Sequence, residues 1–237
     1  AEQINQVYEQ LLATIRSLDE EKEHMLAVEK SKTVFLRSAS HELKTPLTSI
    51  SGIAEIMKNG IMLPADVPHF AGKIYDESQR LITLIGDIIK LSQLDEQSVP
   101  FAWESVNLLE LAEDVQKRLQ SVCEKRKITF QVTGTPCTVQ GVRQVLDEMV
   151  YNISENAIKY NREAGSITVT TGYKEQHPFI RVTDTGIGIP KAEQERVFER
   201  FYRVDKSHSK AVGGTGLGLS IVKHGAILHH ATIHLDS

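Results

Sequence analysis

The residues with the clearest potential for chemistry lie in the stretch 38–48, Ser-Ala-Ser-His-Glu-Leu-Lys-Thr-Pro-Leu-Thr. Residues four apart on a helix share a face, so His41 and Thr45 would point the same way. Glu42 projects roughly 100° from His41, close enough to orient the imidazole through its second nitrogen. No Cys, second His or Asp lies at ligand spacing, so a metal site is not expected here. A lone histidine on a partly buried helix is the alternative, and this stretch alone does not decide between the two.

A second group of polar residues recurs at helical spacing within 141–160. Asn156 offers a neutral carbonyl oxygen, a hard ligand that suits Mg²⁺ already bridged by phosphates. Lys159 suits phosphate oxygens as a point charge. Glu148 and Asn152 continue the same stripe. A solvated helix face is the alternative interpretation of this pattern.

A glycine-containing segment, Asp-Thr-Gly-Ile-Gly-Ile-Pro at 184–190, follows directly after an expected strand. Asp184 can accept a hydrogen bond from an adenine amino group. Gly186 and Gly188 have no side chains, so the backbone there can approach a planar base closely. This pattern is typical of a nucleotide site.

A second glycine-rich segment, Gly-Gly-Thr-Gly-Leu-Gly-Leu-Ser at 213–220, opens an expected helix. Backbone N–H groups at a helix start favour phosphate. The segment is not a P-loop, since no Gly-Lys-Ser/Thr follows, and Leu219 occupies the third glycine position of the Rossmann pattern. Between the two glycine segments, the aromatic residues of 197–203 could hold a mobile lid.

The overall composition is that of a globular chain with room for one large or two modest domains. It has 237 residues, 41% of them hydrophobic and 24% charged, and a net charge of −4 that gives no reason to expect nucleic acid binding. Cys123 and Cys137 match no metal spacing, which favours a reducing compartment. No apolar run approaches the ~18 residues of a membrane span, and no signal peptide is visible. Because the chain begins within a helical pattern and without Met, we expect a fragment.

The N-terminal third predicts helices. Residues 1–30 lack Gly and Pro, and a heptad seam favours a two-stranded coiled coil, with an ordinary amphipathic helix as the alternative. The seam consists of Ile4, Leu11, Leu18 and Met25. One helix is predicted over 3–58, loosened or kinked at Pro46 and ended by Asn59-Gly60.

A second helix is predicted from Asp66, which can serve as its N-cap, to about residue 94, with Pro68 in its first turn. Two antiparallel helices cannot close a core alone, so a four-helix bundle with a second copy, a homodimer, is expected. Residues 95–100 are polar and end in Pro, which suits a hinge.

The remainder mixes strands and helices, which indicates an α/β sandwich. The expected strands are 101–106, about 128–132, about 166–173, about 178–184 and 231–235, and the expected helices are 108–124, roughly 141–160 and about 215–228.

Five of these segments resemble the H, N, G1, F and G2 boxes of the two-component sensor histidine kinases, in that family's order and spacing. The H box has the pattern Ser-His-Glu-x-x-Thr/Asn-Pro-Leu, and the resemblance extends from there to about residue 230. It implies an α+β fold, in which a helical hairpin forming a dimeric four-helix bundle precedes an ATP-binding α/β sandwich shared with DNA gyrase, Hsp90 and MutL. The implied domains are a signalling coiled coil over 1–30, a dimerisation and histidine phosphotransfer hairpin over 31–95, and a catalytic ATP-binding domain over 101–237.

The resemblance also implies a role for each matching residue. His41 would be the phosphate acceptor, Glu42 would orient its ring and accept its proton, and Thr45 would orient a water during dephosphorylation. Asn156 would be the Mg²⁺ ligand, and Asp184 would hold the adenine of ATP. The other residues expected around the nucleotide are Asn152, Lys159, Tyr160, Gly186, Gly188, Arg203, Gly214, Thr215, Gly216, Leu217 and Gly218.

One position distinguishes two chemistries within that superfamily. Its ATP hydrolases activate water with a Glu one turn before the Mg²⁺ ligand, whereas this chain has Asn152, which cannot act as a base at neutral pH. The substitution disfavours a hydrolase and favours phosphate transfer to His41.

The implied function is therefore ATP-dependent autophosphorylation of His41, transfer to an aspartate of a response regulator, and dephosphorylation of that regulator. The implied setting is the cytoplasmic side of a membrane receptor whose sensor region is absent here. A dimeric nucleotide-binding scaffold without phosphotransfer is the alternative. One departure from the family is that His229-His230 replaces a usual Gly pair near the end of the chain, where we expect a frayed sheet edge. A metal site at the histidines of 224–234 is disfavoured against a solvated helix end.

Overall fold

The computed structural model describes residues 2–96, 100–204 and 214–237, without side chains for 2–10 and for 12, 13, 24, 27 and 96. The chain divides into two compact units, residues 1–78 and 79–237. The middle of the predicted hinge, 97–99, lies outside the described residues, as does Gly213.

The first unit is dominated by α1, Glu2–Lys58, which confirms the long predicted helix. Pro46 lies inside α1 without ending it. The helix ends as predicted: Gly60 has a φ of 68°, its N–H donates to the carbonyl of Met57, and the N–H of Ile61 donates to the carbonyl of Ile56. These two bonds form a Schellman motif, which satisfies carbonyls that have no partner within the helix.

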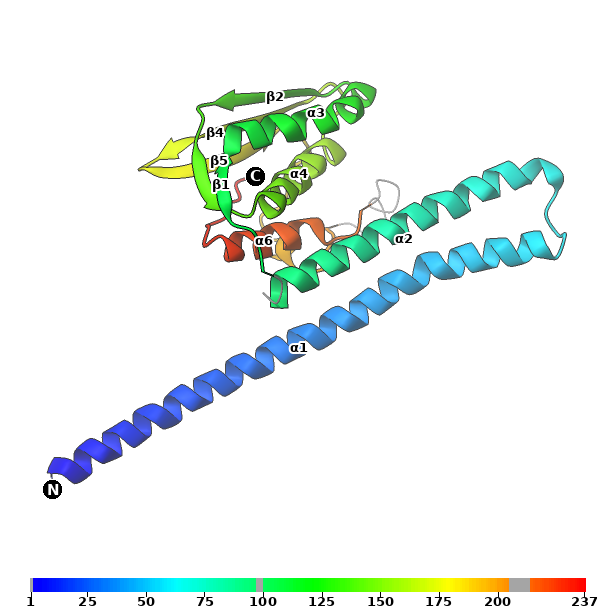
Figure 1. Ribbon diagram of the computed structural model, residues 1–237. Helices are drawn as coiled ribbons and strands as arrows, with labels where there is room; N and C mark the ends of the chain where they lie inside the picture. The colour runs from blue at the N-terminus through cyan, green and yellow to red at the C-terminus, as the bar shows by residue number, and fades with distance from the viewer. Residues whose placement is uncertain (1, 97–99, 205–213) are drawn as a thin grey trace. The chain divides into compact units, whose positions relative to one another are not determined.

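The chain then reverses through a 3-10 turn, Pro64–Asp66, into α2, Val67–Glu96 (Figure 1). The second predicted helix is thus confirmed to within two residues, with Pro68 in its first turn. In the single chain, Ile82, Ile85 and Ile89 of α2 are 61%, 43% and 52% exposed. The described side chains of the heptad seam in α1, those of Leu11, Leu18 and Met25, are also exposed, and the side chain of Ile4 lies outside the description. None of the helices in the described ranges has the length and apolar character needed to cross a membrane.

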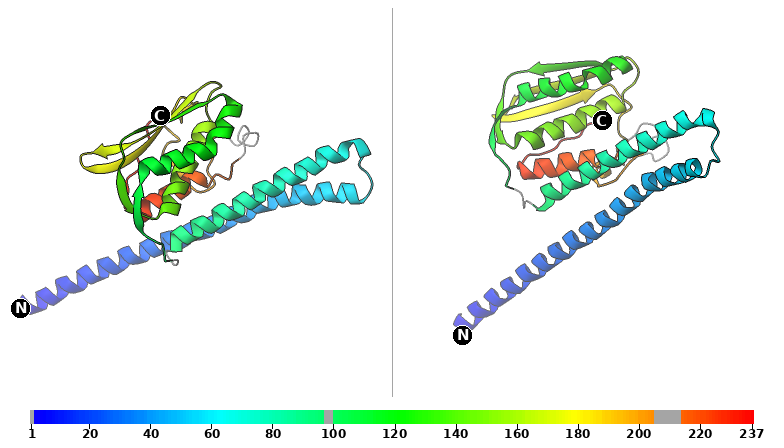
Figure 2. Two further views of the ribbon diagram at one scale, coloured as in Figure 1. Left: turned by 45° about the horizontal axis from the view of Figure 1, so that its top comes forward. Right: turned by 45° about the vertical axis from the view of Figure 1, so that its right-hand side comes forward.

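The second unit contains a three-stranded sheet of order β2-β4-β5, formed by Thr129–Gly134, Ser166–Lys174 and His177–Asp184. β2 and β4 are parallel, whereas β4 and β5 are antiparallel. The helices α3, Leu108–Arg126, and α4, Arg143–Lys159, cover one face of this sheet, with α6, Gly218–Leu228, beside α4 (Figure 2).

The core lies between the sheet and these helices. Its fully buried members include Leu111, Val115, Ile158 and Ile167, which come from α3, α4 and β4. A short antiparallel pair, β1 (Glu104–Asn107) and β3 (Thr138–Gly141), joins the start of α3 to the start of α4. The α/β prediction and the order of its main helices and strands are confirmed.

One local prediction was wrong, and two others placed the start of a correctly predicted element too early. Residues 231–235 form no strand, because the sheet ends at β5 and no ladder pairs with them. The strand expected at 101–106 starts at Glu104, where pairing with β3 begins. The helix expected from 215 begins at Gly218, because the preceding residues form a loop with Gly214 and Gly216 at positive φ.

Candidate nucleotide site and phosphate-acceptor helix

The histidine expected to accept phosphate lies in the middle of α1. His41 and Thr45 are both exposed, while Ala39 and Pro46 are buried and Glu42 is half-buried. The Thr45 hydroxyl donates to the carbonyl oxygen of His41 at 3.2 Å. This is the bond that an ordinary mid-helix threonine makes, so this geometry favours neither role for Thr45.

The polar stripe of α4 faces the start of α6. A methyl group added at Gly218 would lie 3.0 Å from Asn152 Oδ1, so only a glycine fits here without displacing the amide. The other end of that amide, Nδ2, is buried and has no hydrogen-bond partner among the described residues. A buried polar group without a partner is costly, and a bound polar ligand would remove that cost. The arrangement therefore fits a nucleotide at this place.

Two cations and the second glycine segment meet near the end of α4. A methyl group at Gly214 would lie 3.5 Å from Arg203 Nη2 and 3.6 Å from Lys159 Nζ. Arg203 Nη2 also donates to the carbonyl of Gly214 at 2.6 Å, and Lys159 Nζ lies 3.3 Å from Glu155. Two positive groups beside a glycine backbone provide the charge and close approach that phosphates require.

The first glycine segment forms a tight turn after β5. Asp184 Oδ1 accepts the backbone N–H of Gly186 at 2.7 Å, and Ile187 N–H donates to the carbonyl of Tyr160 at 3.1 Å. A methyl group at Gly186 would come within 2.6 Å of both of these oxygens, so the turn requires glycine. Gly188 has a φ of 71°. A carboxylate has further lone pairs, which leaves Asp184 able to accept from an adenine amino group.

The loop before α6 is held by the aromatic segment. Gly216 has a φ of 72°, its carbonyl accepts the N–H of Phe201 at 2.8 Å, and a methyl group there would lie 3.0 Å from Phe201 Cα. Leu217 is fully buried, and its N–H donates to the hydroxyl of Thr215. The Tyr202 hydroxyl donates a hydrogen bond to the Glu193 carboxylate, which raises the pKa of Tyr202, and burial acts in the same direction.

The segments at 152–160, 184–188, 201–203 and 214–218 are thus linked by hydrogen bonds and close contacts into one neighbourhood of unit 2. Sequence reasoning missed Asp87, whose carboxylate accepts from Thr215 at 2.7 Å. The signal was present: Asp87 interrupts the apolar stripe of α2 between Leu84 and Leu91.

No group of three or more His, Cys, Asp or Glu side chains that could hold a metal occurs among the described residues. Asn156 alone could not retain Mg²⁺, which would need phosphate oxygens to complete its ligand set.

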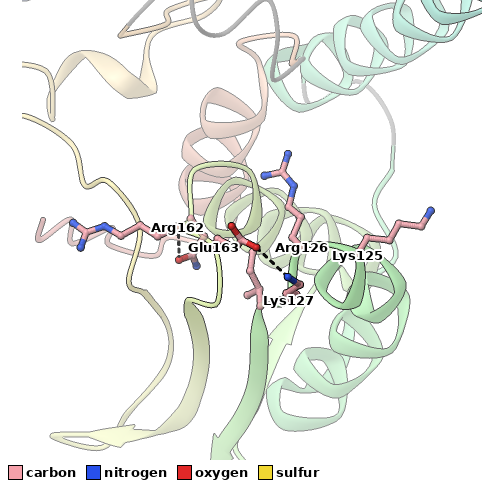
Figure 3. A pocket seen from close by; sticks show the side chains of 7 residues that line it. Lys125, Arg126, Lys127, Arg162 and Glu163 are labelled. Atoms are coloured by element: carbon pink, nitrogen blue, oxygen red, sulfur yellow. Dashed lines mark hydrogen bonds and ion pairs between the residues drawn. The ribbon is translucent and has the colours of Figure 1, made fainter.

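A shallow pocket of about 300 Å³ lies elsewhere, between the end of α3 and the loop after α4 (Figure 3). Arg126 donates there to the carbonyls of Ile158 and Lys159 at the end of α4, a favourable place for a cation. Lys125 and Arg162 extend in opposite directions (Figure 3). Lys125 and Arg162 therefore do not converge on one point, while Arg126 ties the end of α3 to the end of α4.

The helical hairpin carries an exposed histidine, and the α/β unit that follows it has the features of a nucleotide site. Each of these two parts matches a known protein family. Residues 31–97 match the family model of the His Kinase A (phospho-acceptor) domain, and residues 141–237 match that of the histidine kinase-, DNA gyrase B- and HSP90-like ATPases.

Curated relatives share most of the chain. The sensor-like histidine kinase SenX3 of Mycolicibacterium smegmatis is 37% identical over 221 residues, covering 93% of this chain and 57% of the relative. The sensor histidine kinase WalK of Bacillus subtilis is 33% identical over 235 residues, covering 96% of this chain and 37% of the relative. The chain therefore spans between about a third and three fifths of the length of these relatives.

Solved structures show the same fold. The Acinetobacter baumannii histidine kinase AdeS, 23% identical, has a TM-score of 0.65 over 79% of this chain and 86% of that one. The histidine kinase ThkA in complex with the response regulator protein TrrA, 24% identical, has a TM-score of 0.59 over 71% of this chain and 50% of that one. The chain belongs to the two-component sensor histidine kinases.

Proposed function

We propose that this chain is an ATP-dependent protein-histidine kinase that phosphorylates its own His41. The observation that carries the proposal is the meeting of Lys159 and Arg203 at Gly214, together with the Asn152 amide next to Gly218, whose buried nitrogen has no hydrogen-bond partner among the described residues. That arrangement supports binding of a triphosphate, and membership of the kinase family supports its transfer to histidine.

The residues divide the work of the reaction. Asp184 would hold the adenine, Lys159 and Arg203 the phosphates, and Asn156 the Mg²⁺, whose charge offsets that of the phosphates when bound. Transfer breaks the bond between the γ-phosphorus and the bridging oxygen and forms a P–N bond on the neutral ring of His41, and ADP leaves. The proton displaced from the imidazole passes to a carboxylate, for which Glu42 is the neighbouring candidate.

Water is not activated to compete with His41 for the γ-phosphate, because α4 lacks a general base at position 152. An amide at Asn152 cannot take a proton from water at neutral pH, so hydrolysis has no base at that position.

The same proposal assigns the parts of the chain: a coiled coil over 1–30, a dimerisation and phosphotransfer hairpin over 31–95, and a catalytic domain over 101–237. The exposed isoleucines of α2, Ile82, Ile85 and Ile89, support a homodimer, because a second copy would remove this apolar stripe from water. The partner that receives the phosphate would be the aspartate of a response regulator, as the complex of ThkA with TrrA suggests. The parent protein would be a membrane receptor with this part in the cytoplasm.

The test is incubation of the 237-residue chain with γ-labelled ATP and Mg²⁺. We expect covalent label that is lost in acid and kept in base, the behaviour of phosphohistidine, and that is absent from His41→Gln. The variant should bind ATP with parental affinity. A parent chain that binds ATP without gaining label would instead favour a regulatory scaffold, and label that persists in His41→Gln would refute the acceptor assignment.

A further inference from the structure

A carboxylate from α2 contacts the glycine-rich loop of the nucleotide site. Asp87 is 9% exposed, and its Oδ2 accepts the hydroxyl proton of Thr215 at 2.7 Å. Both residues belong to unit 2, which includes the C-terminal part of α2 from Gln79 onward. The two are 128 residues apart in the sequence.

A threonine hydroxyl has one proton to donate. Thr215 gives that proton to Asp87 and accepts the N–H of Leu217 at 3.2 Å. Phosphate oxygens, like carboxylates, only accept hydrogen bonds when ionised. Thr215 can therefore donate to Asp87 or to a phosphate, but not to both at once.

The loop at Thr215 is also where phosphates are expected. Its neighbour Gly214 lies against Arg203 and Lys159, the two cations of the site. The pKa of Asp87 is raised overall, chiefly by burial, and the negative charges of Glu148 and Glu155 act in the same direction. The hydrogen bond from Thr215 and the positive charge of Lys90 lower the pKa in part. A carboxylate on this side of the loop opposes the charge of a nucleotide.

Further contacts hold this face of α2 in place. Lys90 Nζ lies 2.7 Å from Glu148 Oε1 on α4, and Asp95 Oδ2 lies 2.7 Å from Arg200 Nη2. Residues 87, 91 and 95 are four apart and share a helix face, and Leu91 is fully buried. The bond to Thr215 is thus one of a set of contacts along several turns of α2.

We propose that Asp87 competes with the nucleotide phosphates for the hydroxyl proton of Thr215, so that seating of α2 on the glycine-rich loop lowers the affinity for ATP. By linkage, ATP binding would release this part of α2 from the loop. This inference rests on the proposed function, since it needs phosphates at this loop.

The test compares ATP with adenosine, which lacks phosphates, by calorimetric titration of the full chain. Asp87→Ala should bind ATP about three- to tenfold more tightly, the range of one net hydrogen bond, and adenosine at parental affinity. Asp87→Asn, which keeps a neutral acceptor, should lie between the two. In a Thr215→Val background, Asp87→Ala should no longer change ATP affinity. Asp76→Ala, at an exposed position of α2, is the matched control and should behave as the parent.

Parental adenosine binding in the variants checks that they fold. Unchanged or weaker ATP binding in Asp87→Ala, an equal gain for adenosine, or the same gain in the Thr215→Val background would each overturn the competition. A parent chain that binds no ATP would refute the proposed function instead.

Discussion

His229 Nε2 accepts the backbone N–H of Val142 at 2.9 Å, which ties the end of α6 to the start of α4. The other ring nitrogen, Nδ1, lies 2.7 Å from the carbonyl of Gly225, so it carries the proton that this bond needs. The ring also packs against Trp103, with centroids 5.2 Å apart. The histidine that replaces a family glycine thus joins two helices of the nucleotide unit.

We therefore expect His229→Ala to lower the free energy of unfolding by about 1–3 kcal/mol, because the N–H of the buried Val142 would lose its acceptor. Chemical denaturation followed by circular dichroism measures this. His234→Ala, at an exposed position nearby, should stay within about 0.5 kcal/mol of the parent. Equal effects of the two substitutions would show that the bond to Val142 contributes nothing specific.

The pKa of Asp95 leads us to expect that the stability of the fold depends on pH. Burial alone would raise the Asp95 pKa, but the hydrogen bond from His224 and the charge of Arg200 outweigh it and lower the pKa. Because the pKa is lower in the folded state, the Asp95 carboxylate stabilises the fold at pH values above its unfolded-state pKa of about 3.9. This stabilisation is lost as the pH falls through the folded-state pKa.

The difference in unfolding free energy between the parent and Asp95→Asn should accordingly be largest above about pH 5 and shrink below about pH 4. Denaturant titrations from about pH 7 down to about pH 3, a range that includes the unfolded-state pKa, provide the measurement. Asp76→Asn serves as the exposed control on the same helix. A difference that stays constant down to the lowest pH would contradict the role of the Asp95 charge.

Sequence reasoning was most successful where the deciding signal was local. The end of α1 could be predicted because Asn59-Gly60 supplies the left-handed cap within four residues of the carbonyls that it satisfies. β3 was missed because its four residues have no pattern of their own and depend on pairing with β1, some 30 residues earlier. Residues 231–235 alternate like a strand, yet alternation cannot supply a partner ladder.

The same distinction holds for the candidate site. Lys159 and Gly214 were identified from the chemistry of their own segments, and the structure brings them together. The contact between Asp87 and Thr215 could not be inferred in that way, because it depends on how a distant helix packs against the loop.

Asn156→Ala should remove the Mg²⁺-dependent part of ATP affinity, because the variant loses the carbonyl oxygen proposed as the metal ligand. Titration of ATP with and without Mg²⁺ measures that part as a ratio of dissociation constants, and the ratio should fall to about one in the variant. Adenosine binding should be unchanged, which controls for folding. If the parent itself binds ATP equally with and without Mg²⁺, the ligand role of Asn156 is refuted.

Thr45 provides the last prediction, which concerns dephosphorylation of the response regulator. The hydroxyl of Thr45 lies one turn from His41 on the exposed face of α1, and its lone pairs can still accept a hydrogen bond while it donates to the His41 carbonyl. A threonine is no base, so its contribution would be to position the water that attacks the phospho-aspartate.

Thr45→Ala should keep autophosphorylation of His41 near the parental rate. It should slow the loss of label from the regulator by about tenfold or more, which corresponds to an increase of at least ~1.4 kcal/mol in the activation barrier. Thr45→Asn should retain part of the activity, and Thr48→Ala, which loses the equivalent bond to the Lys44 carbonyl, should retain all of it. Dephosphorylation by Thr45→Ala at the parental rate would leave Thr45 with only the helix bond seen here.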